Sequence, residues 1–223
     1  MQKDVENLSE LFSRRDAKSD FYRLRWPPRP MDLALRYAVL LSAIDFDQYS
    51  VDRPLKLLDV GCGLGLLLDY LTANSMIDLV DYIGVDLDKP ILQEAQARWP
   101  GQRFHLRDVR DEPYENDAFD YCIICGIFTD KGESSYEFAV ASAESTLKAV
   151  WPSVKVGLAF NSMSKHVDWE RDDLFHWPLD DIMKFCKRNL SRHVSFYLDY
   201  GLWEVATLVR KAPRRPHINA PWE

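Results

Sequence analysis

The chain has 223 residues and a mass of 26.0 kDa, which favours one domain with an extended end over two full domains. Hydrophobic residues make up 47% and charged residues 28% of the chain, a composition that excludes disordered, collagenous and fibrous proteins. The formal charge of −7 repels polyphosphates at long range, so nucleic acid is not an expected partner.

The sequence also disfavours a membrane-spanning protein and a cysteine metal site. No apolar run reaches the roughly 20 residues that span a bilayer, and residues 1–18 are charged and lack a signal-peptide core. We therefore expect a cytoplasmic protein without a membrane partner. Cys122 and Cys125 lie three positions apart in an apolar run that reads as a strand, so they should face opposite sides of a sheet. Buried free thiols are expected there, and no metal site.

Strand-like runs alternate with helical patterns through the middle of the chain, which is typical of an α/β fold. The expected strands lie at residues 55–60, 82–85, 103–106, 119–125 and 154–160. Asp88 and Pro90 predict the start of one helix, and Ser134 with Glu137 forms a capping box that predicts the start of another.

The alternation stops near the end of the chain. Residues 193–198 and 203–209 are strand-like, and the four residues between them are too few for a crossover helix, so the two runs should form an antiparallel hairpin. Helical patterns at residues 5–12 and 33–44 precede the first strand. The expected organisation is an N-terminal helical lid or extension (1–50), a central domain (51–211) and a C-terminal tail (212–223).

The strongest chemical signal is a glycine loop, Asp59-Val60-Gly61-Cys62-Gly63-Leu64-Gly65, between a predicted strand and a predicted helix. Glycines at such a turn let a ligand touch the backbone. Asp86 ends the next strand, where a carboxylate can accept both hydroxyls of a ribose. The dinucleotide fingerprint would need a glycine at position 66, which is Leu. Asp59, just before the glycines, can hold an ammonium group.

This loop resembles that of the class I S-adenosylmethionine-dependent methyltransferases, and the resemblance covers residues 55–210. It implies a Rossmann-like three-layer α/β sandwich with a seven-stranded mixed sheet. The implied strand order is 3-2-1-4-5-7-6, with strand 7 antiparallel. The C-terminal half looks like a group of small, largely uncharacterised bacterial members of the family. The resemblance to the family implies S-adenosylmethionine as cofactor.

The resemblance also implies roles for individual residues. The loop glycines would lie against the methionine part of the cofactor, and Leu87 would flank the adenine. Asp108 would accept the adenine amino group, with the backbone of Val109 beside it, while the rings of Tyr22 and Trp26 could close over the sulfonium or the acceptor. The expected cofactor-binding residues are Asp59, Gly61, Cys62, Gly63, Gly65, Asp86, Leu87, Asp108, Val109, Cys125 and Tyr22.

The methyl acceptor is expected to be a small molecule. Base-modifying nucleic-acid members of this class carry an Asp or Asn followed by two prolines and an aromatic residue after the fourth strand, whereas this chain reads Cys125-Gly126-Ile127-Phe128. The segment 161–169 should follow the fifth strand on the carboxyl edge of the sheet, where open α/β proteins bind ligands. His166 in this segment is the expected general base, with His176 second.

Two alternatives stay open beside O- or N-methylation of a small molecule. One is a different chemistry on the same cofactor, such as cyclisation or elimination at the sulfonium. The other is a catalytically silent partner subunit that only binds S-adenosylmethionine. S-Adenosylhomocysteine as product would indicate methyl transfer, methylthioadenosine the alternative chemistry, and no turnover a binding role.

Overall fold

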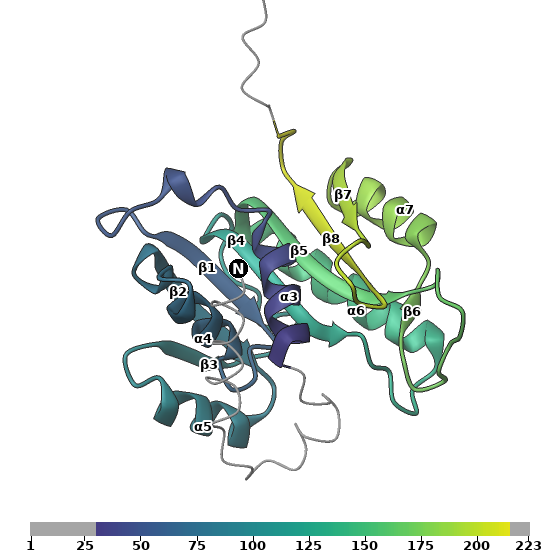
Figure 1. Cartoon of the computed structure of the whole chain (residues 1–223), viewed down its shortest axis with the longest axis horizontal. Helices are drawn as coiled ribbons and strands as arrows, with labels where there is room; N and C mark the ends of the chain where they lie inside the picture. Colours follow the sequence, from purple (N-terminus) through teal and green to yellow (C-terminus); the bar gives the residue numbers. More distant parts are fainter. Residues whose placement is uncertain (1–29, 215–223) are drawn as a thin grey trace, which may run out of the picture.

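The computed structural model describes residues 30–214, which form one mixed sheet between two layers of helices (Figure 1). The strand order is β3-β2-β1-β4-β5-β8-β7, with a short strand β6 paired to the end of β5. The expected α/β sandwich and strand order are confirmed, apart from this eighth strand. The helical pattern at 5–12, Tyr22 and Trp26 lie outside the described residues, as do residues 215–223 of the expected tail.

The elements follow the alternation of the sequence. The strands are β1 (Leu55–Val60), β2 (Val80–Asp86), β3 (Arg103–Leu106), β4 (Phe119–Phe128), β5 (Val154–Ser164), β6 (His176–Trp177), β7 (His193–Tyr197) and β8 (Glu204–Arg210). The α-helices are α3 (Pro30–Leu41), α4 (Leu66–Ala73), α5 (Lys89–Arg98), α6 (Tyr136–Val150) and α7 (Leu179–Asn189). Short 3₁₀ turns occupy Phe46–Gln48, Ile77–Leu79 and Trp151–Ser153.

The first five strands run parallel, and β8 lies antiparallel to both β5 and β7. The expected terminal hairpin is therefore present, and it is inserted so that β8 lies between β5 and β7. Glu204 pairs with Met163 and Arg210 pairs with Gly157. Because β8 runs in the opposite direction, Glu204 reaches the carboxyl edge of the parallel strands.

The end of the fifth strand differs from the sequence expectation. Residues 161–164 belong to β5 rather than to a loop, because β8 continues to pair with it and β6 pairs with Met163 and Ser164. The exposed segment therefore begins at Lys165. Strand β6 has only two residues, too few to show a period of two in the sequence.

Each face of the sheet has its own hydrophobic core. On one face, α3 and α4 bury Leu40 and Leu68 against β1 and β4. On the opposite face, α6 and α7 bury Leu147 and Phe185. Figure 1 shows α3 crossing in front of β4 and β5, with α6 behind them. Residues just after position 30 therefore form part of the main core.

The cysteines follow this division of the sheet. Cys122 is buried in the core under α6 and α7, whereas Cys125 packs against the core under α3 and α4. Their expected opposite facing is confirmed, and all four cysteines are free thiols. Within residues 30–214 no group of three or more His, Cys, Asp or Glu side chains is placed to hold a metal ion. No helix in the same part of the chain is long and apolar enough to cross a membrane.

The starts of two helices, α5 and α6, can be compared with the N-caps predicted from the sequence. Asp88 caps α5, and its carboxylate accepts a hydrogen bond from the Ile91 amide at 3.1 Å, as expected. The cap of α6 is Ser135 and not the expected Ser134, because the Ser135 hydroxyl accepts from the Phe138 amide at 3.1 Å. Ser134 instead donates its amide to the Lys131 carbonyl in the preceding turn.

Candidate functional site

The glycine loop joins β1 to α4 at the carboxyl edge of the sheet. The amides of Gly61 and Cys62 both donate to the Val85 carbonyl, at 2.8 and 3.0 Å, and so tie the loop to the end of β2. Gly61 has a φ of +75°, and a Cβ there would lie 2.3 Å from Cγ2 of Ile127. Only glycine fits this position without strain, which explains the first glycine of the motif.

Asp86 stands at the end of β2, directly against this loop. One of its carboxylate oxygens accepts from the Gly63 amide at 2.9 Å, and the other accepts from the Asp88 amide at 3.0 Å. A carboxylate has about four acceptor positions, so each oxygen keeps one position for a ligand donor. The two halves of the sequence signal, the glycines and the second acid, are therefore in direct contact.

Asp59 lies beneath the loop, with 2% of its surface exposed. Its carboxylate accepts a hydrogen bond from the Tyr82 hydroxyl at 2.7 Å. Burial raises the pKa of Asp59 to about 7, against the lowering effect of the Tyr82 hydrogen bond, and the charge of Asp86 raises it further. Asp59 therefore changes its charge near neutral pH.

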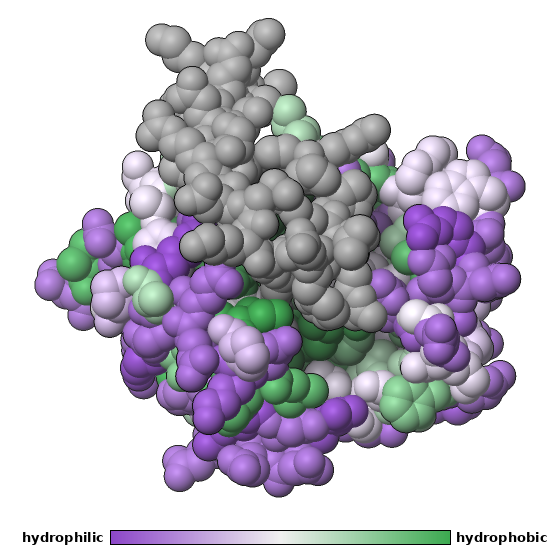
Figure 2. All heavy atoms as spheres, turned by 90° about the horizontal axis from the view of Figure 1, so that it is seen from below, coloured by the Kyte–Doolittle hydropathy of each residue, from purple (hydrophilic) through white to green (hydrophobic). Residues whose placement is uncertain are grey.

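A cavity of about 300 Å³ opens beside the loop and Asp86. Five of the expected cofactor residues line it, namely Gly61, Asp86, Leu87, Asp108 and Val109. Figure 2 looks at this edge of the molecule and shows hydrophobic residues gathered around a hollow, with hydrophilic residues outside them. The lining combines apolar side chains with charged ones from Asp86 to Lys131, and convergent polar groups in a concave, partly apolar site are typical of small-molecule binding.

Asp108, the acid after β3, forms an ion pair with Arg110 that the sequence did not predict. Nε of Arg110 lies 2.9 Å from Oδ1 of Asp108, and Nη2 of Arg110 lies 2.6 Å from Oδ2. These hydrogen bonds, together with the Arg110 amide and the guanidinium charge, hold the pKa of Asp108 below its usual range. Arg110 also reaches the Ser142 hydroxyl of α6 at 3.3 Å, so it joins the loop after β3 to the far wall of the cavity.

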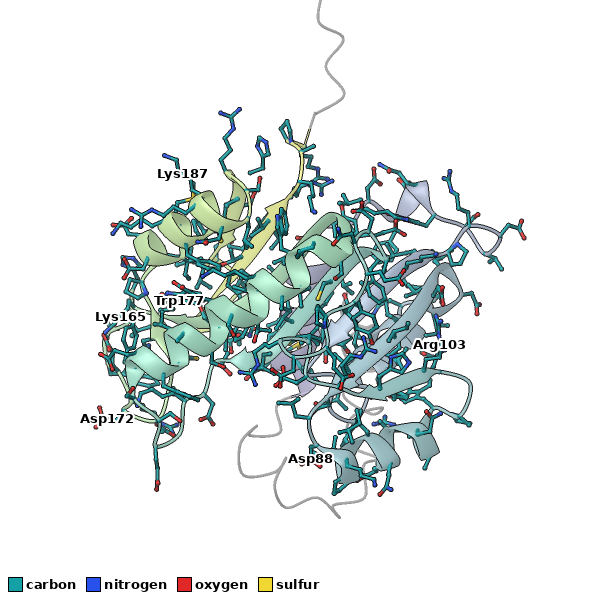
Figure 3. The ribbon with its side chains drawn as sticks, turned by 180° about the vertical axis from the view of Figure 1, so that it is seen from behind. Asp88, Arg103, Lys165, Asp172, Trp177 and Lys187 are labelled. Atoms are coloured by element: carbon teal, nitrogen blue, oxygen red, sulfur yellow. The ribbon has the colours of Figure 1, made fainter. Side chains whose placement is uncertain are left out.

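Other expected site residues do not line the cavity. Cys62 and Cys125 are covered by the loop and by α3, and burial raises the pKa of both thiols. His166 is exposed beyond the end of β5, where its amide donates to the Ser164 hydroxyl at 3.0 Å. Figure 3 labels Lys165, which precedes His166, and Asp88, whose amide donates to Asp86. The two labelled residues lie well apart along the sheet.

His176 is a packed structural residue. It is 3% exposed, and its Nδ1 lies 2.6 Å from the Ser164 carbonyl, which can only accept. Nδ1 therefore carries the proton, and Nε2 accepts from the Arg171 amide at 3.4 Å. Both ring nitrogens of His176 have hydrogen-bond partners, so this second base candidate serves to hold β6 beside β5.

The far wall of the cavity comes from residues that were not among the expected site residues. Ile127 and Phe128 end β4, Lys131 lies in the following loop, and Phe138 and Ser142 come from α6. Phe138 is 63% exposed, an unusual position for a large aromatic side chain. The position of Phe138 away from the apolar stripe of α6, which runs through Ala143, Leu147 and Val150, was the one available signal for this wall.

Comparison with known proteins agrees with the geometry. The family described as a methyltransferase domain matches residues 57–150. A protein of Mycobacterium tuberculosis described as a methyltransferase is 34% identical over 161 residues, which are 71% of this chain and 95% of that protein.

Solved structures share the fold at low sequence identity. Magnesium protoporphyrin IX methyltransferase from Synechocystis PCC 6803, solved with S-adenosylhomocysteine, superposes with a TM-score of 0.61 at 13% identity, over 94% of this chain and 100% of that one. Human N-acetylserotonin methyltransferase, solved with S-adenosylmethionine, gives 0.58 at 13% identity, over 93% of this chain and 66% of that one. By its sequence relatives and its fold, this chain belongs to the class I S-adenosylmethionine-dependent methyltransferases.

Proposed function

We propose that this enzyme transfers the methyl group of S-adenosylmethionine to an oxygen or nitrogen atom of a small molecule. The observation that carries the proposal is the cavity in which the backbone of Gly61 and the carboxylate of Asp86 meet an apolar wall. Residues 51–211 would form the catalytic domain together with α3, which packs in the same core.

The residues at the loop suit the cofactor of this family. Asp86 keeps acceptor positions for the two ribose hydroxyls, and Leu87, which is 61% exposed, offers an apolar surface to an adenine ring. The Val109 backbone and Asp108 would meet the polar edge of the adenine. When bound, S-adenosylmethionine supplies an electrophilic methyl group, and the protein orients it.

A small acceptor is supported by charge and by the outer wall of the cavity. The net charge of −7 opposes polyanions. Lys131 and Phe138 on the outer wall of the cavity offer a cation and an aromatic face. The neighbouring structures act on chemically different molecules, so they do not favour one acceptor class over another.

The proposal is tested by product analysis. The purified protein is incubated with S-adenosylmethionine and a panel of phenols, carboxylic acids and amines, and the nucleoside products are quantified. Acceptor-dependent S-adenosylhomocysteine is the expected product. Methylthioadenosine would instead support a different chemistry at the sulfonium, and tight binding without turnover across the panel would support a binding subunit.

We also propose His166 as the general base where the acceptor must lose a proton. It lies outside the cavity, beyond the end of β5 on the carboxyl edge, so the acceptor would have to extend from the cavity to reach it; its ring makes no hydrogen bond to the described residues. General-base assistance typically contributes about 10²–10⁴-fold. His166→Ala should therefore lower kcat at least tenfold and leave the Kd for S-adenosylhomocysteine unchanged.

The matched control is His193→Ala. His193 begins β7 and pairs with Arg210 at the opposite edge of the sheet, so this variant should keep the wild-type kcat. Full turnover in His166→Ala would show that methyl transfer proceeds without this base.

A further inference from the structure

A buried polar network connects α3 to the end of β4. Arg36 of α3 donates to both carboxylate oxygens of Glu204 at the start of β8, with its Nε at 2.8 and 2.9 Å. The other donor to Glu204 is Nδ2 of Asn161, at 2.6 Å from Oε2. Oδ1 of Asn161 in turn accepts from the Gly126 amide at 2.8 Å.

The groups of this network are almost fully removed from water. Glu204 is 4% exposed and Asn161 is 1% exposed, and the side chain of Arg36 is 13% exposed. A buried ion pair with a further hydrogen bond contributes little net stability compared with apolar packing. Its placement at the carboxyl edge therefore calls for a reason beyond stability.

The network ends on a peptide that is fixed from both sides. The Gly126 amide is held by Asn161, and its carbonyl accepts from the Thr129 hydroxyl at 2.7 Å. Gly126 has a φ of +90°, a left-handed conformation that turns the chain sharply at this point of β4. The next residue, Ile127, packs directly on the bare Cα of Gly61 and lines the cavity.

We infer that Asn161 and Glu204 are positioning residues that hold the end of β4, and with it Ile127, in the place that completes the cofactor cavity. We call Arg36, Glu204 and Asn161 the β4 anchor. None of the three lines the cavity, so the anchor acts through the Gly126 peptide. Because Arg36 belongs to α3, the anchor also ties this helix to the cofactor-binding edge.

The test separates positioning from stability. Asn161→Leu removes both hydrogen bonds at nearly constant volume. If the β4 end then holds its competent position about a tenth of the time, the apparent Kd for S-adenosylhomocysteine rises about tenfold. The double variant Arg36→Met/Glu204→Gln removes the ion pair but keeps an oxygen that accepts from Asn161. It should raise the Kd less than Asn161→Leu does, because the Gly126 amide still donates to Asn161, even where its melting temperature falls further.

Ser162→Ala is the matched control. It lies next to Asn161 on β5, and its buried hydroxyl has no hydrogen-bond partner among the described residues. We expect the wild-type Kd for this variant. An unchanged Kd in Asn161→Leu, an equal loss in Ser162→Ala, or a Kd that follows the melting temperature in all variants would overturn the inference.

The affinity readout rests on the proposed cofactor use, so a second readout is needed. Amide hydrogen exchange at residues 126–128 reports the anchor without any ligand. Asn161→Leu should speed this exchange, the double variant should speed it less, and Ser162→Ala should leave it unchanged. If the wild type fails to bind S-adenosylhomocysteine, the proposed cofactor use fails and exchange alone decides on the anchor. If Asn161→Leu does not fold, Asn161→Ser is compared in the same way.

Discussion

Asp86→Ala is expected to weaken binding of S-adenosylhomocysteine by about 10- to 100-fold. Hydrogen bonds to a charged group contribute roughly 1.5–3 kcal/mol, which corresponds to that range of affinity. Part of the loss comes from the protein itself, because the carboxylate also holds the amides of Gly63 and Asp88. Isothermal titration calorimetry measures the effect directly.

Two variants make this result specific to the site. Asp86→Asn keeps the side-chain volume and one oxygen but loses the charge, so it should give an intermediate Kd. Asp111→Ala removes an exposed acid in the loop after β3 that does not line the cavity, and it should leave the Kd unchanged. Wild-type affinity in Asp86→Ala would contradict the placement of the ribose at the end of β2.

Asp59→Asn is expected to stabilise the protein at pH 8 and to leave stability nearly unchanged at pH 4. Burial raises the folded-state pKa from 3.8 to about 7. Between these pH values the unfolded chain releases a proton that the folded protein retains, so wild-type stability falls as pH rises towards 7. The full difference is on the order of 4 kcal/mol at 1.36 kcal/mol per pKa unit. Urea denaturation at several pH values measures it.

Asp69→Asn provides the contrasting control. Asp69 is also buried, at 3% exposed, but it forms an ion pair with Arg98. Removing its charge leaves a cation without its partner, so this variant should be less stable than the wild type at pH 8. Parallel pH profiles of wild type and Asp59→Asn would show that Asp59 is already ionised in the folded protein.

Asp59 also tests the binding of a ligand ammonium group. If the ligand ammonium reaches the carboxyl beneath the loop, it favours the ionised form, and wild-type affinity for S-adenosylhomocysteine should then rise as pH increases through 7. Asp59→Asn should bind more weakly at pH 8 and lose this part of the pH dependence. The same variant would therefore raise stability and lower affinity.

The cofactor edge was predictable because its signals are local. The glycines at 61, 63 and 65 and the acid at 86 each follow a strand, and parallel strands bring their carboxyl ends to one edge. Sequence order alone thus places the Asp86 carboxylate near the glycine loop. The strand order itself came from the resemblance to the family, and comparison with solved structures agrees with it.

The parts that sequence could not predict depend on distant or very short features. Arg36 and Glu204 are 168 positions apart, and no local pattern indicates that they meet. Strand β6 has only two residues, too few to show the alternation of side chains that indicates a strand. Its pairing with β5 decides where the exposed segment begins. Ser134 and Ser135 are both good caps, so the choice between them depends on how the preceding turn closes.

The placement of β8 has a consequence for the integrity of the chain. The elements on either side of the exposed segment after Ser164 are held by contacts outside that segment. Strand β5 pairs with β8, and α7 is buried in the core. A protease cut between Lys165 and Glu170 would leave two fragments that remain associated through the seven residue pairs between β5 and β8 and through both hydrophobic cores. The enzyme could therefore be reconstituted from two separately expressed pieces, and recovered cofactor binding would report their assembly.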